Sequence, residues 1–106
     1  MQKISFNDII ESIKEPWEPK EIAFVSDAAL RVAMIHGAYD WHIHKSEDEL
    51  FFVLKGKIYI DTEQGTIELN ELEGFLVKKG TRHRSRSDAP SWVLLFEPKK
   101  TKTKGE

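Results

Sequence analysis

The 106-residue sequence contains no cysteine. Disulfide bonds, thiolate nucleophiles, zinc sites with thiolate ligands and cysteine-held iron–sulfur clusters are therefore excluded. A metal ion bound to this chain must take nitrogen and oxygen ligands.

Long apolar segments are also missing. The longest apolar runs, 50–54 and 92–96, have five residues each, whereas a membrane-spanning helix needs about 20. The first eight residues lack the apolar core of a secretion signal. We therefore expect no membrane association, no secretion and a cytoplasmic location.

A strong excess of charge of one sign is absent, since the net charge is −2. Residues 1–96 carry 12 basic and 16 acidic side chains, and four lysines follow in the last eight residues. An acidic body is not typical of nucleic-acid binding, so no nucleic-acid partner is expected. We interpret residues 98–106 as a flexible basic tail.

The length predicts one domain in three parts. Residues 1–20 form an N-terminal lead-in, with a short helix predicted over 4–14 that Ser5 or Asn7 caps. Residues 21–97 form a β barrel, and residues 98–106 form the tail.

Short stretches of alternating apolar and polar residues predict the strands of this barrel. We expect connecting loops over 70–74 and 87–90. The predicted strands are 22–25, 30–34, 50–54, 57–62, 66–69, 75–77, 82–85 and 91–96. Eight or nine short strands without long helices between them predict an antiparallel all-β sandwich or barrel.

A possible metal centre begins with His42 and His44, which are two residues apart. Side chains at this spacing leave a strand on the same face. Glu49 opens the next apolar strand, and His83 starts a later one that a sheet can bring alongside. Three imidazoles and a carboxylate suit iron, manganese, nickel, copper or zinc. The alternative acids, Glu47 and Asp48, are interpreted as solvated loop residues.

The spacing Gly37-x4-His42-x-His44-x4-Glu49-x6-Gly56 resembles the first signature of the cupins. Residues 74–83 resemble the second signature in part, with a lysine where that family usually has proline. The resemblance covers roughly residues 22–97. It implies a double-stranded β-helix, or jelly roll, that holds one divalent transition-metal ion. By position, the implied ligands are the same three histidines and glutamate.

The resemblance implies a small metal-dependent protein but does not name its reaction. We expect an isomerase, lyase or dioxygenase acting on a polar small molecule, such as a sugar derivative or keto acid. No general acid or base is identified, and His36, Tyr39 and Tyr59 are candidates for the cavity on their chemistry alone. The alternatives are a non-catalytic module that binds a small ligand or a metal, and a structural dimerisation domain.

Two features of the sequence suggest binding partners: an apolar strand face and a basic cluster. Leu50, Phe52 and Leu54 need an apolar cover, which a second copy in a homodimer or the N-terminal helix supplies. A basic cluster surrounds His83. Its members are Lys78, Lys79, Arg82, Arg84 and Arg86. We expect Arg82 and Arg84 to point outward and pair with acids such as Glu47 and Asp48. Lys78 and Arg86 are expected at the mouth, where they suit an anionic ligand.

Overall fold

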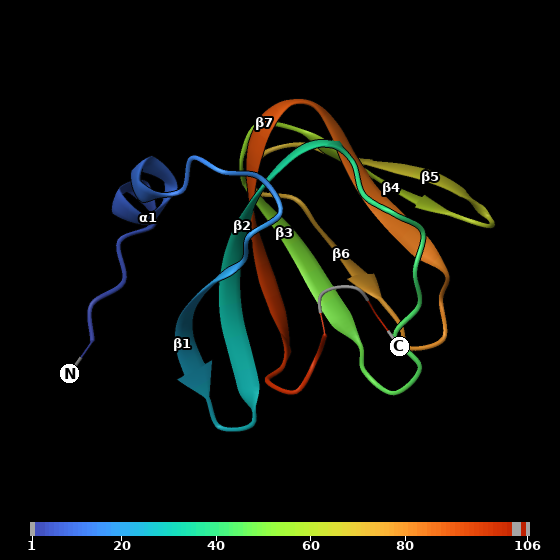
Figure 1. Ribbon diagram of the computed structural model, residues 1–106, viewed down its shortest axis with the longest axis horizontal. Coiled ribbons are helices and arrows are strands. Elements are labelled where there is room, and N and C mark those ends of the chain that lie inside the picture. The colour runs from blue at the N-terminus through green and yellow to red at the C-terminus, as the bar shows by residue number, and fades with distance from the viewer. Residues whose placement is uncertain (1, 103–104, 106) are drawn as a thin grey trace.

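The computed structural model describes residues 2–102 and 105, and over these residues the chain forms seven strands and one short helix (Figure 1). The elements are α1 (Phe6–Ser12), β1 (Lys20–Val25), β2 (Ala28–Ala38), β3 (Glu49–Lys55), β4 (Ile58–Thr62), β5 (Gly65–Leu69), β6 (Gly74–Val77) and β7 (His83–Pro98). All strand pairs are antiparallel.

The long strand β7 connects two groups of strands. Its C-terminal half lies between β2 and β3 in the order β1-β2-β7-β3-β6, while its N-terminal part pairs with β4, which pairs in turn with β5. In Figure 1 β7 bends at the top of the view as it passes from one group to the other. This arrangement confirms the predicted all-β jelly roll with a short N-terminal helix.

The prediction of a loop over 87–90 was wrong, because β7 continues through these residues. Strands 82–85 and 91–96 are therefore one strand, and the described chain has seven rather than eight or nine. Side-chain hydroxyls stabilise the bend: Ser87 Oγ lies 2.8 Å from the carbonyl oxygen of Ile35, and Ser91 Oγ lies 3.0 Å from that of Lys57. A register shift in β2 between Ile35 and Gly37 accommodates it.

Apolar side chains from both groups of strands fill the barrel. Fully buried Val53, Ile58, Ile60 and Val93 lie at its centre. The small residue Gly56 is required where β3 turns into β4, because its φ is +97° and a Cβ there would lie 2.8 Å from the Cβ of Ser91.

The N-terminal helix packs on the outside of β2. Ser5 caps it as predicted, accepting a hydrogen bond from the Asp8 N–H, although the helix is shorter than the predicted 4–14. Ile13 is buried against Val32 and Met34, and the indole of Trp92 donates a hydrogen bond to the Ile13 carbonyl. Within the described residues, no helix has the length and hydropathy needed to span a membrane.

The start of the C-terminal tail is held against the barrel. Thr101 is buried, and its carbonyl accepts a hydrogen bond from Arg31. Residues 103, 104 and 106 of the predicted flexible tail lie outside the described residues.

Candidate metal centre

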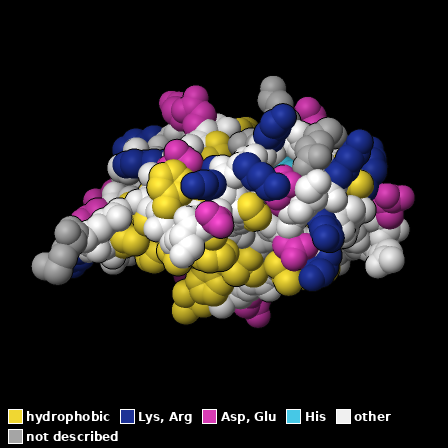
Figure 2. Space-filling view, turned by 90° about the horizontal axis from the view of Figure 1, so that it is seen from below, with side chains coloured by type: hydrophobic (Ala, Val, Ile, Leu, Met, Phe, Trp, Pro, Cys, Tyr) yellow, Lys and Arg dark blue, Asp and Glu magenta, His cyan; other side chains and the backbone are white. Residues whose placement is uncertain are grey.

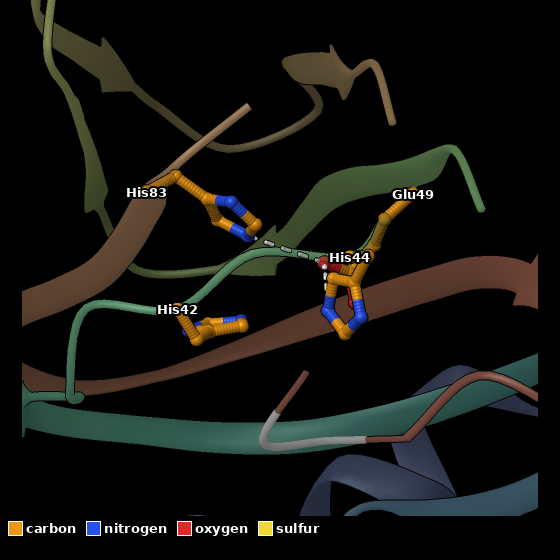
Figure 3. A group of neighbouring side chains, drawn as sticks. All are labelled: His42, His44, Glu49 and His83. Carbon is orange, nitrogen blue, oxygen red and sulfur yellow. Dashed lines mark ion pairs between the residues drawn. The ribbon is translucent and has the colours of Figure 1, made fainter. Parts of the chain in front are cut away.

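Backbone pairing brings the two histidine segments together. The N–H of His42 donates to the His83 carbonyl and the N–H of His83 to the His42 carbonyl, each at 2.9 Å. The carbonyl of His44 accepts from the Gly80 N–H at 2.8 Å, and Glu49 begins the adjoining strand β3. One donor atom from each of the four side chains lies within 4.8 Å of all the others (Figure 3).

Two of the histidines are oriented by carbonyl groups next to them in the sequence. Nδ1 of His42 lies 2.9 Å from the Asp40 carbonyl oxygen, and Nδ1 of His83 lies 2.9 Å from that of Thr81. Because a carbonyl oxygen only accepts, Nδ1 carries the proton in both rings. Each Nε2 therefore keeps a free lone pair, which is the form that binds a metal.

Several polar atoms of this group are buried without a hydrogen-bond partner among the described residues. They are both ring nitrogens of His44, Nε2 of His83 and Oε1 of Glu49. Oε1 of Glu49 lies 3.6 Å from His44 Nε2 and 3.5 Å from His83 Nε2 (Figure 3). Buried polar atoms are normally paired. A cation shared by Oε1 of Glu49, Nε2 of His83 and one ring nitrogen of His44 would satisfy three of these four atoms, so the residues present fit a metal ion.

Burial sets the protonation of the centre. It lowers the pKa of His42, His44 and His83, so all three imidazoles are neutral at pH 7. It raises the pKa of Glu49, because a carboxylate is poorly solvated there. Neutral imidazoles are the form that binds a metal. A divalent ion would supply the positively charged partner that the buried Glu49 carboxylate lacks.

Sequence reasoning missed a second buried carboxyl group beside the centre. The register that pairs Leu50 with Phe96 places Glu97 next to Glu49. Arg31 lies behind Glu97, with Nη1 2.8 Å from Oε1. Burial, followed by the hydrogen bond with Glu49, raises the pKa of Glu97 to about 8. The sequence does contain a signal for this buried position. Glu97 lies two residues after inward-facing Leu95, and side chains at this spacing on a strand share a face.

A small cavity of about 40 Å³ adjoins the centre. Its wall includes the site residues His42 and Glu49. The other lining residues are Trp17, Pro19, Ala33, Ile35, Tyr39, Phe51, Ser85, Val93 and Leu95. Tyr39, one of the three candidates for the cavity, is thus on the wall. Its ring lies between those of Trp17 and His42, with centroids 4.9 and 5.5 Å away.

The other two candidates do not line this cavity in the described structure. His36 is exposed, because its neighbour Ile35 points into the barrel and side chains alternate along a strand. Tyr59 lies between inward-facing Ile58 and Ile60, so its ring faces outward beneath the guanidinium of Arg86.

The basic cluster is engaged on the outside of the barrel. Nε of Arg84 and of Arg86 each lie 2.8 Å from Asp61 Oδ2, and Lys78 lies 3.5 Å from Asp48. Lys78 and Arg86, which we expected at the mouth, pair with these acids and are not among the described residues that line the cavity.

Two related expectations also need correction. Arg84 pairs with an acid as expected, but the acid is Asp61 rather than Glu47 or Asp48. The guanidinium groups of Arg82 and Arg84 also lie over the ring of Trp41, at 4.9 and 5.3 Å from its centroid. Glu47 is buried, not solvated.

Comparisons with known proteins show the family of this chain. Residues 30–96 match the family model described as the cupin domain. The chain belongs to the cupin family. This cupin is 38% identical over 96 residues to the uncharacterized protein YdbB of Bacillus subtilis (strain 168), which covers 90% of this chain and 85% of YdbB.

Two solved structures are similar over nearly their full length. A cupin-2 domain containing protein from Shewanella frigidimarina NCIMB 400 has a TM-score of 0.88 at 28% identity, covering 91% of this cupin and 94% of that chain. Protein NMB1881 from Neisseria meningitidis has a TM-score of 0.84 at 28% identity, covering 92% and 99%.

Proposed function

We propose that this cupin binds one divalent transition-metal ion through His42, His44, Glu49 and His83 and acts with it on a small molecule. The observation that supports this proposal is the convergence of four donor atoms, most of them buried and otherwise unpaired. The donor types suit iron, manganese, nickel, copper or zinc. When bound, such an ion supplies Lewis-acid or redox chemistry to oxygen atoms of the ligand.

The chain's own residues prepare the site for this chemistry. The carbonyls of Asp40 and Thr81 fix the ring orientation of His42 and His83. Burial raises the pKa of Tyr39, so its hydroxyl stays protonated at neutral pH and is available as a hydrogen-bond or proton donor at the cavity wall. The reaction classes consistent with these parts are isomerase or lyase and dioxygenase.

A second candidate is a non-catalytic module that binds a metal or small ligand. It is favoured by the cavity wall, where Tyr39 is the only described titratable side chain apart from His42 and Glu49. A base separate from the metal ligands is therefore missing from this wall. Turnover of any small oxygenated molecule by the metal-loaded protein distinguishes an enzyme from a binding module.

A cytoplasmic location stays a prediction, for which cell fractionation is the test.

The metal site is tested with His44→Ala and its matched control His36→Ala. We expect Co²⁺ to produce visible absorption bands with one ion per chain in the wild-type and His36→Ala proteins. His44→Ala should bind at least tenfold more weakly, because it loses one of four ligands. Circular dichroism checks that both variants fold. Equal Co²⁺ binding by folded His44→Ala and the wild type would overturn the proposal.

We also propose that this cupin forms a homodimer. Leu54, on the outer face of β3, packs against the cluster formed with the N-terminal segment, and Leu50, Phe52 and Leu54 are all only half-buried. Nearby Leu76 and Phe96 are 47% and 39% exposed. Figure 2, which views the molecule from below, shows apolar side chains gathered in one part of its surface. An apolar surface of this kind is typical of a contact between subunits.

Leu76→Glu tests the dimer, with Leu72→Glu in an exposed turn as the control. Sedimentation equilibrium should give twice the chain mass of 12.3 kDa for the wild type and Leu72→Glu. It should give a monomer for Leu76→Glu, because a charge would then be buried in the contact. A monomeric wild type at micromolar concentration would contradict the proposal.

A further inference from the structure

The wall of the cavity beside the metal centre is mainly apolar. Ala33, Ile35, Val93 and Leu95 from β2 and β7 form one part of it, and the ring of Phe51 lies on β3. Besides the metal ligands, the lining residues with polar side-chain atoms are Trp17 with its indole N–H, and Tyr39 and Ser85 with their hydroxyls. A ligand with many hydroxyl groups would leave most of them unpaired against this wall, which is costly.

Positive charge on the protein is directed away from the cavity. None of the described lysines and arginines is on its wall. Arg31, which contacts Glu97 beside the centre, is held by Glu97, by Glu21 and by the carbonyls of Lys99 and Thr101. Among the described residues, a second anionic group on a ligand would therefore find no lysine or arginine partner on this wall.

The charge of the centre sets the charge of the ligand. Three neutral imidazoles and one carboxylate leave a divalent ion with a net charge of +1. One carboxylate on the ligand neutralises this charge, so the complex can be surrounded by apolar side chains. A phosphate ester or a dicarboxylate would leave a net negative charge in the same surroundings.

The size of the cavity limits the rest of the ligand. One water molecule needs about 10–15 Å³ by this measure, so a cavity of about 40 Å³ holds roughly three atoms of that size. An ethyl or isopropyl group fits this space. The ring of Trp17 closes one side of the cavity, and Trp17 has a positive φ of 67° with its N–H bound to the Met34 carbonyl.

We infer that the ligand of this cupin is a monocarboxylate with a neighbouring hydroxyl or oxo oxygen and a short apolar side chain: a small 2-hydroxy or 2-oxo acid. This inference rests on the proposed metal site. It selects the keto-acid class over sugar derivatives, and it identifies the wall formed by Ala33, Ile35, Val93 and Leu95 as the part of the protein that discriminates between them.

The test uses two acids that differ in one group. 2-Hydroxybutyrate and glycerate share the carboxylate and the 2-hydroxyl, and a terminal methyl in the first replaces a terminal hydroxyl in the second. Both enantiomers of each acid are titrated into the full-length protein loaded with Co²⁺. Calorimetry and the shift of the Co²⁺ absorption bands measure binding without requiring turnover.

We expect 2-hydroxybutyrate to bind at least tenfold more tightly than glycerate, and 3-phosphoglycerate to bind more weakly than either. Ala33→Ser adds a hydroxyl to the wall and should reduce the preference several-fold. Ala89→Ser, at an exposed position of β7, is the matched control and should leave it unchanged. If Ala33→Ser does not fold, the wild-type preference alone decides.

The outcomes separate this inference from the proposed function. Co²⁺ bands combined with equal or tighter binding of glycerate would overturn the apolar-ligand inference and leave the metal site intact. Absence of Co²⁺ bands would overturn the metal site, and the inference with it.

Discussion

A neutral amide at position 97 should stabilise the metal-free protein above neutral pH. Glu97 is buried beside Glu49, and its pKa is raised from 4.5 to about 8. The folded protein therefore keeps a proton that the unfolded chain releases. The stability due to this proton is complete below pH 4.5 and is lost as the pH rises to about 8. Glu97→Gln cannot titrate and should escape this loss.

The size of the effect follows from the pKa difference. At 1.36 kcal/mol per pH unit, a rise from 4.5 to about 8 corresponds to at most about 5 kcal/mol of unfolding free energy. Glu49 contributes to the raised pKa of Glu97, and we therefore expect a gain of about 2–5 kcal/mol for Glu97→Gln at high pH. For a chain of this length, 1 kcal/mol shifts Tm by about 4 °C.

Thermal unfolding in the presence of a chelator, followed by circular dichroism from pH 5 to 8.5, measures this gain. The Tm of Glu97→Gln minus that of the wild type should be small at pH 5 and at least about 8 °C at pH 8.5. The three site histidines have lowered pKa values, so their contribution to the free energy of unfolding decreases as the pH falls, which is opposite to the effect of Glu97. Burial, the largest cause of these histidine shifts, is common to both proteins. A pH-independent difference in Tm would refute the reasoning.

Two further predictions concern the metal and the backbone. Co²⁺ affinity, measured by titration, should fall about tenfold or more from pH 7.5 to 5.5. The reason is that burial raises the pKa of Glu49, so that a proton competes with the ion for this carboxylate. An affinity independent of pH would contradict this. Gly56→Ala should lower the free energy of unfolding by about 2–4 kcal/mol, since it combines a positive φ with a close approach to Ser91. Gly37→Ala is the control, with a similar φ of +85° and no atom within 4 Å of a Cβ, and should cost only about 1–2 kcal/mol in urea denaturation. Equal losses for the two variants would contradict the assigned contact.

Much of the fold was predictable because the strands carry local signals. The alternation of Ile58 and Ile60 with polar residues predicted the hairpin of β4 and β5, which the structure contains. The bend of β7 was not predictable from such signals. Residues 87–90 resemble a loop in composition, and they stay in a strand through pairing with β2 on both sides of the bend and through the hydroxyl contacts of Ser87 and Ser91 with distant carbonyls.

For the candidate site, spacing indicated which residues come together, and the structure places His42, His44, Glu49 and His83 in one group. Spacing did not indicate what surrounds them. Glu97 stands next to Glu49 only through the register of β3 and β7, and the cavity wall combines side chains from four separated segments. The charge of the lysine- and arginine-rich segment around His83 suggested an anionic ligand, but ion pairs with acids such as Asp61 turn that charge outward.

X-ray absorption at the metal edge of the loaded protein tests the central proposal most directly. Scattering from imidazole rings counts the histidine ligands independently of any reaction. We predict nitrogen and oxygen donors at about 2.0–2.2 Å, with three imidazoles in the wild type and two in His83→Ala. Fewer than three imidazoles in the wild type, or the same spectrum for the wild type and His83→Ala, would contradict the proposed centre.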